Sequence, residues 1–343
     1  MGMRRARLKV PEEEVGFYHC VSRVVDRRRV LREVEKEHFA ALMRECEEFC
    51  EVRVLTYCLM SNHFHILVEV PKPPEVLPSP GEILAKVRRL TGHSNAGAVE
   101  QRLKMYRDAK DEAGLRAYLE TFYARMWDVS PFMKMLKQRF TQWYNGRRGR
   151  KGTLWEERFK SVLVEGRGQA LAAMAAYIDL NPVRAGMVED PKAYRWCGYG
   201  EAVAGKRQAR EGLRVIATAL ESGREPTLSR GLEVYRTWLF NEGDAEREAA
   251  DEQGRPVRGV LKREEVLAVL QNKGRLPLGA YVRCRVRYFC DGAVVGSRGF
   301  VEDLFRTYRT RYGPKRKDGA RPMRGLAKGE LYAIRDLRLG VFG

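Results

Sequence analysis

Two short β-type segments joined by a two-residue turn constrain the fold of this chain more than any other feature. Residues 52–60 (VRVLTYCLM) and 63–70 (HFHILVEV) are rich in the β-branched and aromatic residues that favour strands. Ser61 and Asn62 lie between them and predict a turn. The pattern therefore predicts an antiparallel hairpin within a larger sheet.

The second strand of this hairpin carries two of the five histidines of the chain. Because side chains alternate along a strand, His63 and His65 share one face, and Phe64, Ile66 and Val68 share the other. Two neutral imidazoles plus one oxygen ligand can bind a divalent ion and leave positions open for a substrate. A His-x-His pair also occurs without any role in metal binding, so the motif alone leaves a structural interpretation open.

A strand and a helix precede the hairpin. Residues 16–24 (GFYHCVSRV) alternate and are rich in β-forming residues. Residues 35–50 carry apolar side chains at helical spacing, namely Phe39, Leu42, Met43, Cys46 and Phe49. The order strand–helix–strand–strand predicts the start of a compact antiparallel α/β sandwich.

Prolines interrupt this pattern after the hairpin. Residues 71–80 (PKPPEVLPSP) end regular structure, and the charged stretch that follows predicts a helical insertion over 71–130. The core pattern then resumes with a helix at 130–149, a strand at 161–165 and a helix at 169–180. The Asn181-Pro182 pair ends the last helix, because proline disfavours helical geometry in the residue before it.

The character of the chain changes beyond about Gly205. Residues 206–343 mix helical stretches with linkers such as 241–256 (NEGDAEREAADEQGRP). A helix is predicted after Ser297, and the run 308–325 is basic and loop-like. We therefore expect two regions, 10–205 and 206–343.

The charge of the chain points to a nucleic-acid partner. Lys and Arg number 64 against 45 Asp and Glu, a formal net charge of +19. Contacts between such cations and phosphates release counterions and supply affinity that does not depend on sequence. A basic protein with no such partner is the alternative that charge alone leaves open.

The seven cysteines are scattered and form no CxxC pair, which predicts reduced thiols and neither a disulfide framework nor a zinc ribbon. No apolar stretch reaches the length of a transmembrane helix, and no apolar segment of signal-peptide type follows the basic start. We expect a cytoplasmic protein with no membrane contact.

The helix predicted at 169–180 carries a tyrosine among small side chains. Tyr177 and Asn181 are four residues apart and share a face unless the helix unwinds at Pro182. Alanines at 172, 173, 175 and 176 let this helix lie close to a sheet. A buried tyrosine with its hydroxyl bonded is the structural alternative, and the chain holds fifteen tyrosines.

A basic stretch with interspersed aromatic residues runs from residue 134 to 160 (KMLKQRFTQWYNGRRGRKGTLWEERFK). Cations hold phosphates, and exposed rings stack on unpaired bases. Some of the rings belong to the core, since Phe140 and Trp143 lie at helical spacing with Leu136. The candidate DNA-binding residues are Lys134, Lys137, Arg139, Arg147, Arg148, Arg150, Lys151, Arg158 and Lys160.

Four segments together resemble the HUH single-tyrosine transposases of the insertion-sequence type, and most closely the REP-associated tyrosine transposases. They are HFH (63–65), YIDLNPVRAG (177–186), GTLWEERFKSVLVE (152–165) and GFYHCVSR (16–23). The resemblance covers roughly residues 10–205. It implies an α+β fold, with a ferredoxin-like antiparallel sheet and packed helices. Residues 206–343 resemble the C-terminal extension of longer members, with a DNA-binding or an accessory role left open.

The resemblance also implies a chemistry. Tyr177 is the implied nucleophile and forms a covalent 5′-phosphotyrosine link. The implied metal ligands are His63, His65 and Asn181, with Mg²⁺ or Mn²⁺ as the ion. Asn181 departs from shorter relatives, which typically carry glutamine there, so its shorter arm leaves its ligation open.

The expected partner is single-stranded or hairpin DNA from repetitive palindromes, in a bacterial cytoplasm and associated with the nucleoid. The first hypothesis is an endonuclease and strand-transferase, and the alternative is a hairpin-binding protein that does not cleave. An RNA-directed nuclease is a third possibility, since unpaired strands of either polymer stack on rings. The sequence leaves monomer and homodimer undecided.

Overall fold

A single sheet of seven strands organises the described part of the chain. The computed structural model describes residues 7–241, 282, 286–324, 326 and 331–335. Along the sheet the strand order is β2-β3-β1-β4-β5-β7-β6. The strands are β1 (Gly16–Arg23), β2 (Arg53–Leu59), β3 (His63–Val70), β4 (Lys160–Val164), β5 (Gly292–Gly296), β6 (Arg321–Pro322) and β7 (Tyr332–Arg335).

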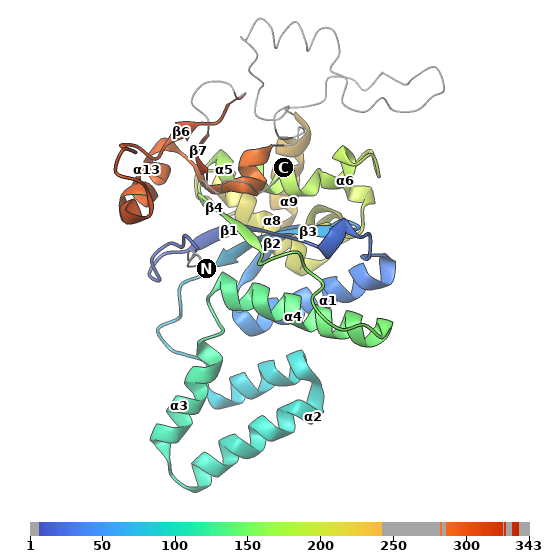
Figure 1. Ribbon diagram of the computed structural model, residues 1–343, viewed down its shortest axis with the longest axis vertical. Coiled ribbons are helices and arrows are strands. Elements are labelled where there is room, and N and C mark those ends of the chain that lie inside the picture. Colours follow the sequence, from blue (N-terminus) through green and yellow to red (C-terminus); the bar gives the residue numbers. More distant parts are fainter. Residues whose placement is uncertain (1–6, 242–281, 283–285, 325, 327–330, 336–343) are drawn as a thin grey trace, which may run out of the picture.

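Helices cover both faces of this sheet (Figure 1). The first face carries α1 (Glu33–Cys50) and α4 (Val129–Arg148), with Phe64, Ile66 and Val68 packed beneath them. The second face carries α5 (Gln169–Asp179), α8 (Arg207–Leu220) and α9 (Leu228–Asn241). Shorter helices are α6 (Asn181–Arg184) and α7 (Gly198–Val203), with 3-10 turns at Val25–Arg27, Pro191–Ala193 and Arg309–Arg311.

The first four strands have the ferredoxin-like arrangement. The chain order β1-α1-β2-β3-α4-β4 gives the sheet order β2-β3-β1-β4, with each neighbouring pair antiparallel. Both intervening helices lie on the same face. The predicted α+β fold with packed helices is confirmed.

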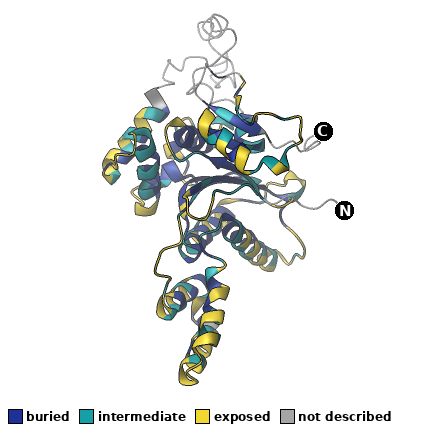
Figure 2. Ribbon diagram, turned by 90° about the vertical axis from the view of Figure 1, so that its left-hand side faces the viewer, coloured by how far each residue is buried: buried dark blue, intermediate teal, exposed yellow. Residues whose placement is uncertain are grey.

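The insertion forms a helical arm that projects beyond the α1 and α4 layer (Figures 1 and 2). It consists of α2 (Pro80–Asp108) and α3 (Glu112–Tyr123). Ser79 caps α2, since its hydroxyl accepts from the Glu82 amide and the Glu82 carboxylate accepts from the Ser79 amide. The chain kinks at Gly92, whose φ of 76° suits glycine.

The described part of residues 206–343 shares the sheet with the first region. Strand β5 pairs in parallel with β4, and β7 pairs antiparallel with β5. The helix predicted after Ser297 is α13 (Arg298–Thr307), capped by the Ser297 hydroxyl. A short helix, α12 (Arg287–Asp291), precedes β5. The predicted linker at 241–256 lies, from residue 242 on, outside the described residues, and the boundary at 205 stays a prediction.

Within the described ranges, no helix combines the length and apolar character that crossing a membrane requires.

Candidate active site

His63 and His65 lie on the second face of the sheet, beneath α5. The strand alternation places them there, while Phe64 between them enters the core under α1. His65 is 3% exposed and His63 is half-buried. Their ring centroids are 5.1 Å apart and their planes nearly perpendicular. The predicted sharing of a face by the two histidines is confirmed.

Tyr177 faces this histidine pair from α5. Its ring centroid lies 6.1 Å from that of His65, and the residue is only 3% exposed. The approach is close because α5 presents alanines to its surroundings, and those at 172, 173, 175 and 176 are fully buried. The Tyr177 hydroxyl lies 3.0 Å from the Cys290 Sγ, and the Phe289 ring packs edge-on at 5.1 Å.

A third imidazole, His19 on β1, completes the cluster. In the β1–β3 register His65 lies opposite Val21, so His19 is its diagonal neighbour on the same face. The His19 Nε2 lies 2.9 Å from the His65 Nδ1, and the His19 Nδ1 donates to the Phe289 carbonyl oxygen at 2.7 Å. Burial lowers the pKa of His19 to about 4 and holds the pKa of His65 well below its usual value.

The helix does unwind between Tyr177 and Asn181. α5 ends at Asp179, and α6 begins at Asn181 with Pro182 in its first turn. The Asn181 side-chain nitrogen donates back to the carbonyl oxygens of Tyr177 and Ile178, at 3.2 Å each. This contact fixes the amide group of Asn181 against the end of α5.

Cations gather around the tyrosine and the histidines. The Arg184 guanidinium lies 4.2 Å from the centroid of the Tyr177 ring and donates to the Tyr177 and Val282 carbonyl oxygens. Arg23 lies opposite His63 in the β1–β3 register. Lys160 lies opposite Val21 on the other side of β1, which places it on the same face. Lys160 forms an ion pair with Asp291 at 3.6 Å, so the positive potential suited to phosphate comes from Arg184 and Arg23.

The histidines supply two of the ligand atoms that a divalent ion would need. The His63 Nδ1 donates to the Asn62 side-chain oxygen at 2.7 Å, so the neutral imidazole carries its lone pair on Nε2. No group of three His, Cys, Asp or Glu able to hold a metal occurs among the residues that the structure describes. An ion here would therefore bind two imidazoles, with its other positions left to amide, water or substrate oxygens. The predicted ligand set of His63, His65 and Asn181 stays a prediction.

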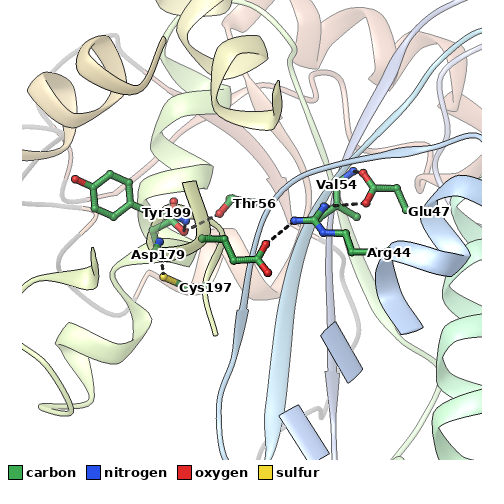
Figure 3. Close-up of polar contacts among 9 residues, drawn as sticks. Arg44, Glu47, Val54, Thr56, Asp179, Cys197 and Tyr199 are labelled. Carbon is green, nitrogen blue, oxygen red and sulfur yellow. Dashed lines mark hydrogen bonds and ion pairs between the residues drawn. The ribbon is translucent and has the colours of Figure 1, made fainter. Parts of the chain in front are cut away.

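A buried carboxylate anchors the tyrosine helix (Figure 3). Asp179 is fully buried and accepts from the Thr56 and Tyr235 hydroxyls at 2.6 Å each, and from the Tyr199 amide at 3.2 Å. These partners come from β2, α9 and α7. Burial raises the pKa of Asp179 to about 6. The network ties the helix of Tyr177 to three other elements.

A second polar network lies on the α1 side of β2 (Figure 3). The Arg44 guanidinium forms ion pairs of 2.8 Å with both Glu47 and Glu201. The other Glu47 oxygen accepts from the Val54 amide at 2.6 Å. Because Glu201 lies in α7, this network joins α1 and β2 to the helix that also contacts Asp179.

The basic stretch of residues 134–160 divides into buried and exposed parts. Lys137 is only 9% exposed and donates to the Glu157 carbonyl oxygen at 2.8 Å beneath the Trp155 ring, and burial lowers its pKa to about 8. The Arg139 guanidinium is likewise engaged, with the Leu90 carbonyl oxygen. The exposed members are Lys134, Arg147, Arg148, Lys151 and Arg158, with Arg150 and Lys160 half-buried.

The end of the basic stretch runs beside the histidine site. The Val25 amide donates to the Leu154 carbonyl oxygen, and the Glu156 amide donates to the Arg23 carbonyl oxygen, both at 3.0 Å. Arg23 in turn lies opposite His63. The loop after α4 therefore reaches the site, whereas α4 itself covers the opposite face of the sheet.

Four residues of the site were not predicted from the sequence. The strand alternation of residues 16–24 contained His19, but its register against β3 is not readable from sequence. Arg184 stood in the quoted YIDLNPVRAG segment. Cys290 and Phe289 gave no local signal, because they lie far along the chain from Tyr177.

Comparisons with known proteins bear on the first part of the site. Residues 15–83 match the family described as "Transposase IS200 like". This segment contains His19, His63 and His65 and ends before the Tyr177 helix. The predicted resemblance to insertion-sequence transposases is confirmed over these residues.

One solved structure similar to this chain is described as "Structure of the REP associates tyrosine transposase bound to a REP hairpin". The two share 13% sequence identity with a TM-score of 0.37, over 60% of this chain and 86% of that one. No curated protein matches the sequence.

Proposed function

We propose that this chain is a transposase-like single-strand DNA endonuclease and strand-transferase that acts on repetitive palindromic hairpin DNA. The observation that carries the proposal is the position of Tyr177, whose ring lies 6.1 Å from that of His65 beside a histidine pair. The family match over residues 15–83 and the net charge of +19 support a DNA substrate.

In the proposed reaction the Tyr177 oxygen attacks the scissile phosphorus in line. A bond forms between the phenolic oxygen and phosphorus as the bond from phosphorus to the 3′ oxygen breaks. The phenolic proton is released and the departing 3′ oxygen takes up a proton, so charge balances. The products are a 5′-phosphotyrosine and a free 3′-hydroxyl, and rejoining by the reverse attack needs no ATP.

Residues of the site divide the remaining tasks. Arg184 and Arg23 supply positive charge near the attacked phosphate, and the Arg184 contact with the Tyr177 ring fixes that ring. Mg²⁺ or Mn²⁺ held by His63 and His65 would polarise the scissile phosphate. Because the Tyr177 hydroxyl contacts Cys290, the phosphate reaches it only after this contact opens.

A hairpin-binding protein that does not cleave is the second candidate. It is favoured by the burial of Tyr177, which is 3% exposed with its hydroxyl engaged by a thiol. In that case the exposed cations of the basic stretch of residues 134–160, among them Lys151 and Arg158, would bind the hairpin and no residue would cleave it.

The test is a denaturing gel of the protein with labelled hairpin DNA from the repeats of its own genome, in Mg²⁺, in Mn²⁺ and in EDTA. We expect a metal-dependent, protein-linked DNA band that disappears in Tyr177→Phe. The matched control is Tyr144→Phe, a buried tyrosine of α4 on the opposite face of the sheet, which should retain the band.

Two results would contradict the proposal. Tight binding without a covalent band in any metal supports the non-cleaving alternative. A band that survives in Tyr177→Phe but is lost in Tyr144→Phe would show that Tyr177 is not the nucleophile.

A further inference from the structure

A chain of hydrogen bonds runs from a backbone carbonyl through two buried imidazoles. The Phe289 carbonyl oxygen lies 2.7 Å from the His19 Nδ1, and the His19 Nε2 lies 2.9 Å from the His65 Nδ1. The two ring planes are nearly parallel, with an interplanar angle of 19° and centroids 5.1 Å apart, so the rings meet edge to edge through their nitrogens. His19 is fully buried and His65 is 3% exposed.

The carbonyl at one end fixes the direction of every bond in this chain. A carbonyl oxygen only accepts, so the His19 Nδ1 carries a proton. A buried imidazole without a carboxylate beside it is neutral, so the His19 Nε2 carries a lone pair and accepts. The His65 Nδ1 must then carry the proton of the second bond. The neutral His65 is left with its lone pair on Nε2.

We propose that His19 is a positioning residue that sets the tautomer of His65 and so makes the His65 Nε2 the metal-ligating atom. The presence of a metal in this inference rests on the proposed function. The tautomer of His65 follows from the hydrogen bonds alone. Metal-ligating histidines generally donate their other ring nitrogen to a fixed acceptor, which orients the ring. Here the acceptor is a second imidazole, held in turn by residue 289 of the C-terminal region.

The surroundings of His19 support a dedicated role. Its neighbours on this face of the sheet include Leu67, which lies directly opposite it, and Val162 on β4, which lies opposite it on the other side. A polar ring among such residues is unfavourable unless both nitrogens are bonded, and in His19 both are. An apolar residue in place of His19 would fill the same space without the cost of removing polar nitrogens from water, so packing alone does not explain a histidine here.

The direct test is long-range ¹H–¹⁵N NMR of the metal-free protein labelled with ¹⁵N-histidine. The chain has five histidines, so each is assigned by a single substitution. We expect His19 and His65 to be protonated at Nδ1 and unprotonated at Nε2. A His65 protonated at Nε2 would overturn the inference, whatever the protein does to DNA.

The second test measures binding of Mn²⁺ alone by electron paramagnetic resonance. His19→Phe keeps a planar ring but removes the acceptor, and we expect affinity to fall about 10–100-fold. His19→Gln offers an amide oxygen to His65 and an amide N–H to the Phe289 carbonyl, so it should restore most of the affinity. His38→Phe is the matched control, because His38 stacks on Trp143 away from the site.

The outcomes separate this inference from the proposed function. Correct tautomers and Mn²⁺ binding without DNA cleavage leave the inference standing and remove the nuclease proposal. Cleavage with unchanged Mn²⁺ affinity in His19→Phe removes the inference and leaves the nuclease proposal. If His19→Phe does not fold, the NMR measurement on the unaltered protein decides alone.

Discussion

His63 and His65 stand two residues apart and differ in how deeply they are embedded. His65 is buried and bonded to His19, whereas His63 is half-buried and contacts the side chain of Asn62 next to it. Loss of the His65 ring leaves a cavity and an unsatisfied acceptor on His19, while loss of the His63 ring leaves neither in the core. The two histidines can therefore be separated by experiment.

At the residue scale, we predict that His63→Ala and His65→Ala both abolish the covalent DNA adduct but differ in stability. Urea denaturation should show the free energy of unfolding lowered by about 1–3 kcal/mol in His65→Ala, because an unsatisfied buried acceptor costs that much. His63→Ala should lower it by less than about 1 kcal/mol, because the half-buried ring leaves no cavity and no unsatisfied acceptor in the core. Equal losses in the two variants would contradict the burial described for them.

At the scale of elements, α5 holds Tyr177 over the histidines through its last residue, Asp179. The carboxylate of Asp179 reaches Thr56, Tyr199 and Tyr235, each in a different element. The tyrosine that faces the histidines and the carboxylate that anchors the helix are therefore only two residues apart on α5.

We predict that Asp179→Ala lowers the free energy of unfolding by about 3 kcal/mol, because it leaves buried donors without their acceptor. Urea denaturation followed by circular dichroism measures this loss. The matched control is Asp303→Ala on α13, whose exposed ion pair with Arg306 contributes at most about 1 kcal/mol. A loss in Asp179→Ala no greater than the control's would show that α5 is held by apolar packing alone.

Much of this element-level structure could be predicted from the sequence. The strand predicted at 63–70 is observed at those residues, and the helix predicted at 130–149 is observed at Val129–Arg148. Alternation and helical spacing are local patterns, so they carry this information. The pairing of β4 with β5 and the contact of Cys290 with Tyr177 join distant segments, and no local pattern encodes them.

The same distinction applies to the basic stretch. Its charges were visible in the sequence, but only the fold separates Lys137, which is buried, from Arg158, which is exposed. Burial depends on what α4 packs against, and that is a property of the whole molecule.

At the scale of the whole molecule, DNA binding should depend on salt through the exposed cations only. We predict that Arg158→Gln lowers the magnitude of the slope of log Kd against log salt concentration by about 0.7–0.9, the value of one phosphate contact. Lys137→Met should leave the slope unchanged, since its ammonium group is engaged inside the protein. Fluorescence anisotropy with labelled hairpin DNA over a range of salt concentrations measures both. An equal effect of the two substitutions would contradict this assignment.

The buried thiols predict a loss of stability at alkaline pH. Burial raises the pKa of Cys46 from 9.0 to about 12, so between these values the unfolded chain loses the thiol proton and the folded protein keeps it. The stabilisation is therefore complete below pH 9 and is lost as the pH rises from about 9 towards 12. Each such thiol contributes about 1.4 kcal/mol per pH unit in this range.

We predict that Cys46→Ala reduces the slope of unfolding free energy against pH above pH 9 by about 1.4 kcal/mol per unit. The variant is less stable at pH 7, because Cys46 is fully buried and the shorter side chain leaves a cavity. Urea denaturation at pH 8, 9 and 10 measures the slope. An unchanged slope would show that the thiol ionises equally in the folded and unfolded states.

The contact between Tyr177 and Cys290 has a consequence for synthesis on the ribosome. The two residues are 113 positions apart, so about 6–23 s separate their emergence at roughly 5–20 residues per second. During that interval the nascent chain already contains β1 to β4 and the tyrosine helix, but not the segment that covers the hydroxyl or the carbonyl that holds His19. The order of translation thus delays the contact of the Tyr177 hydroxyl with Cys290 until the chain has been made as far as residue 290.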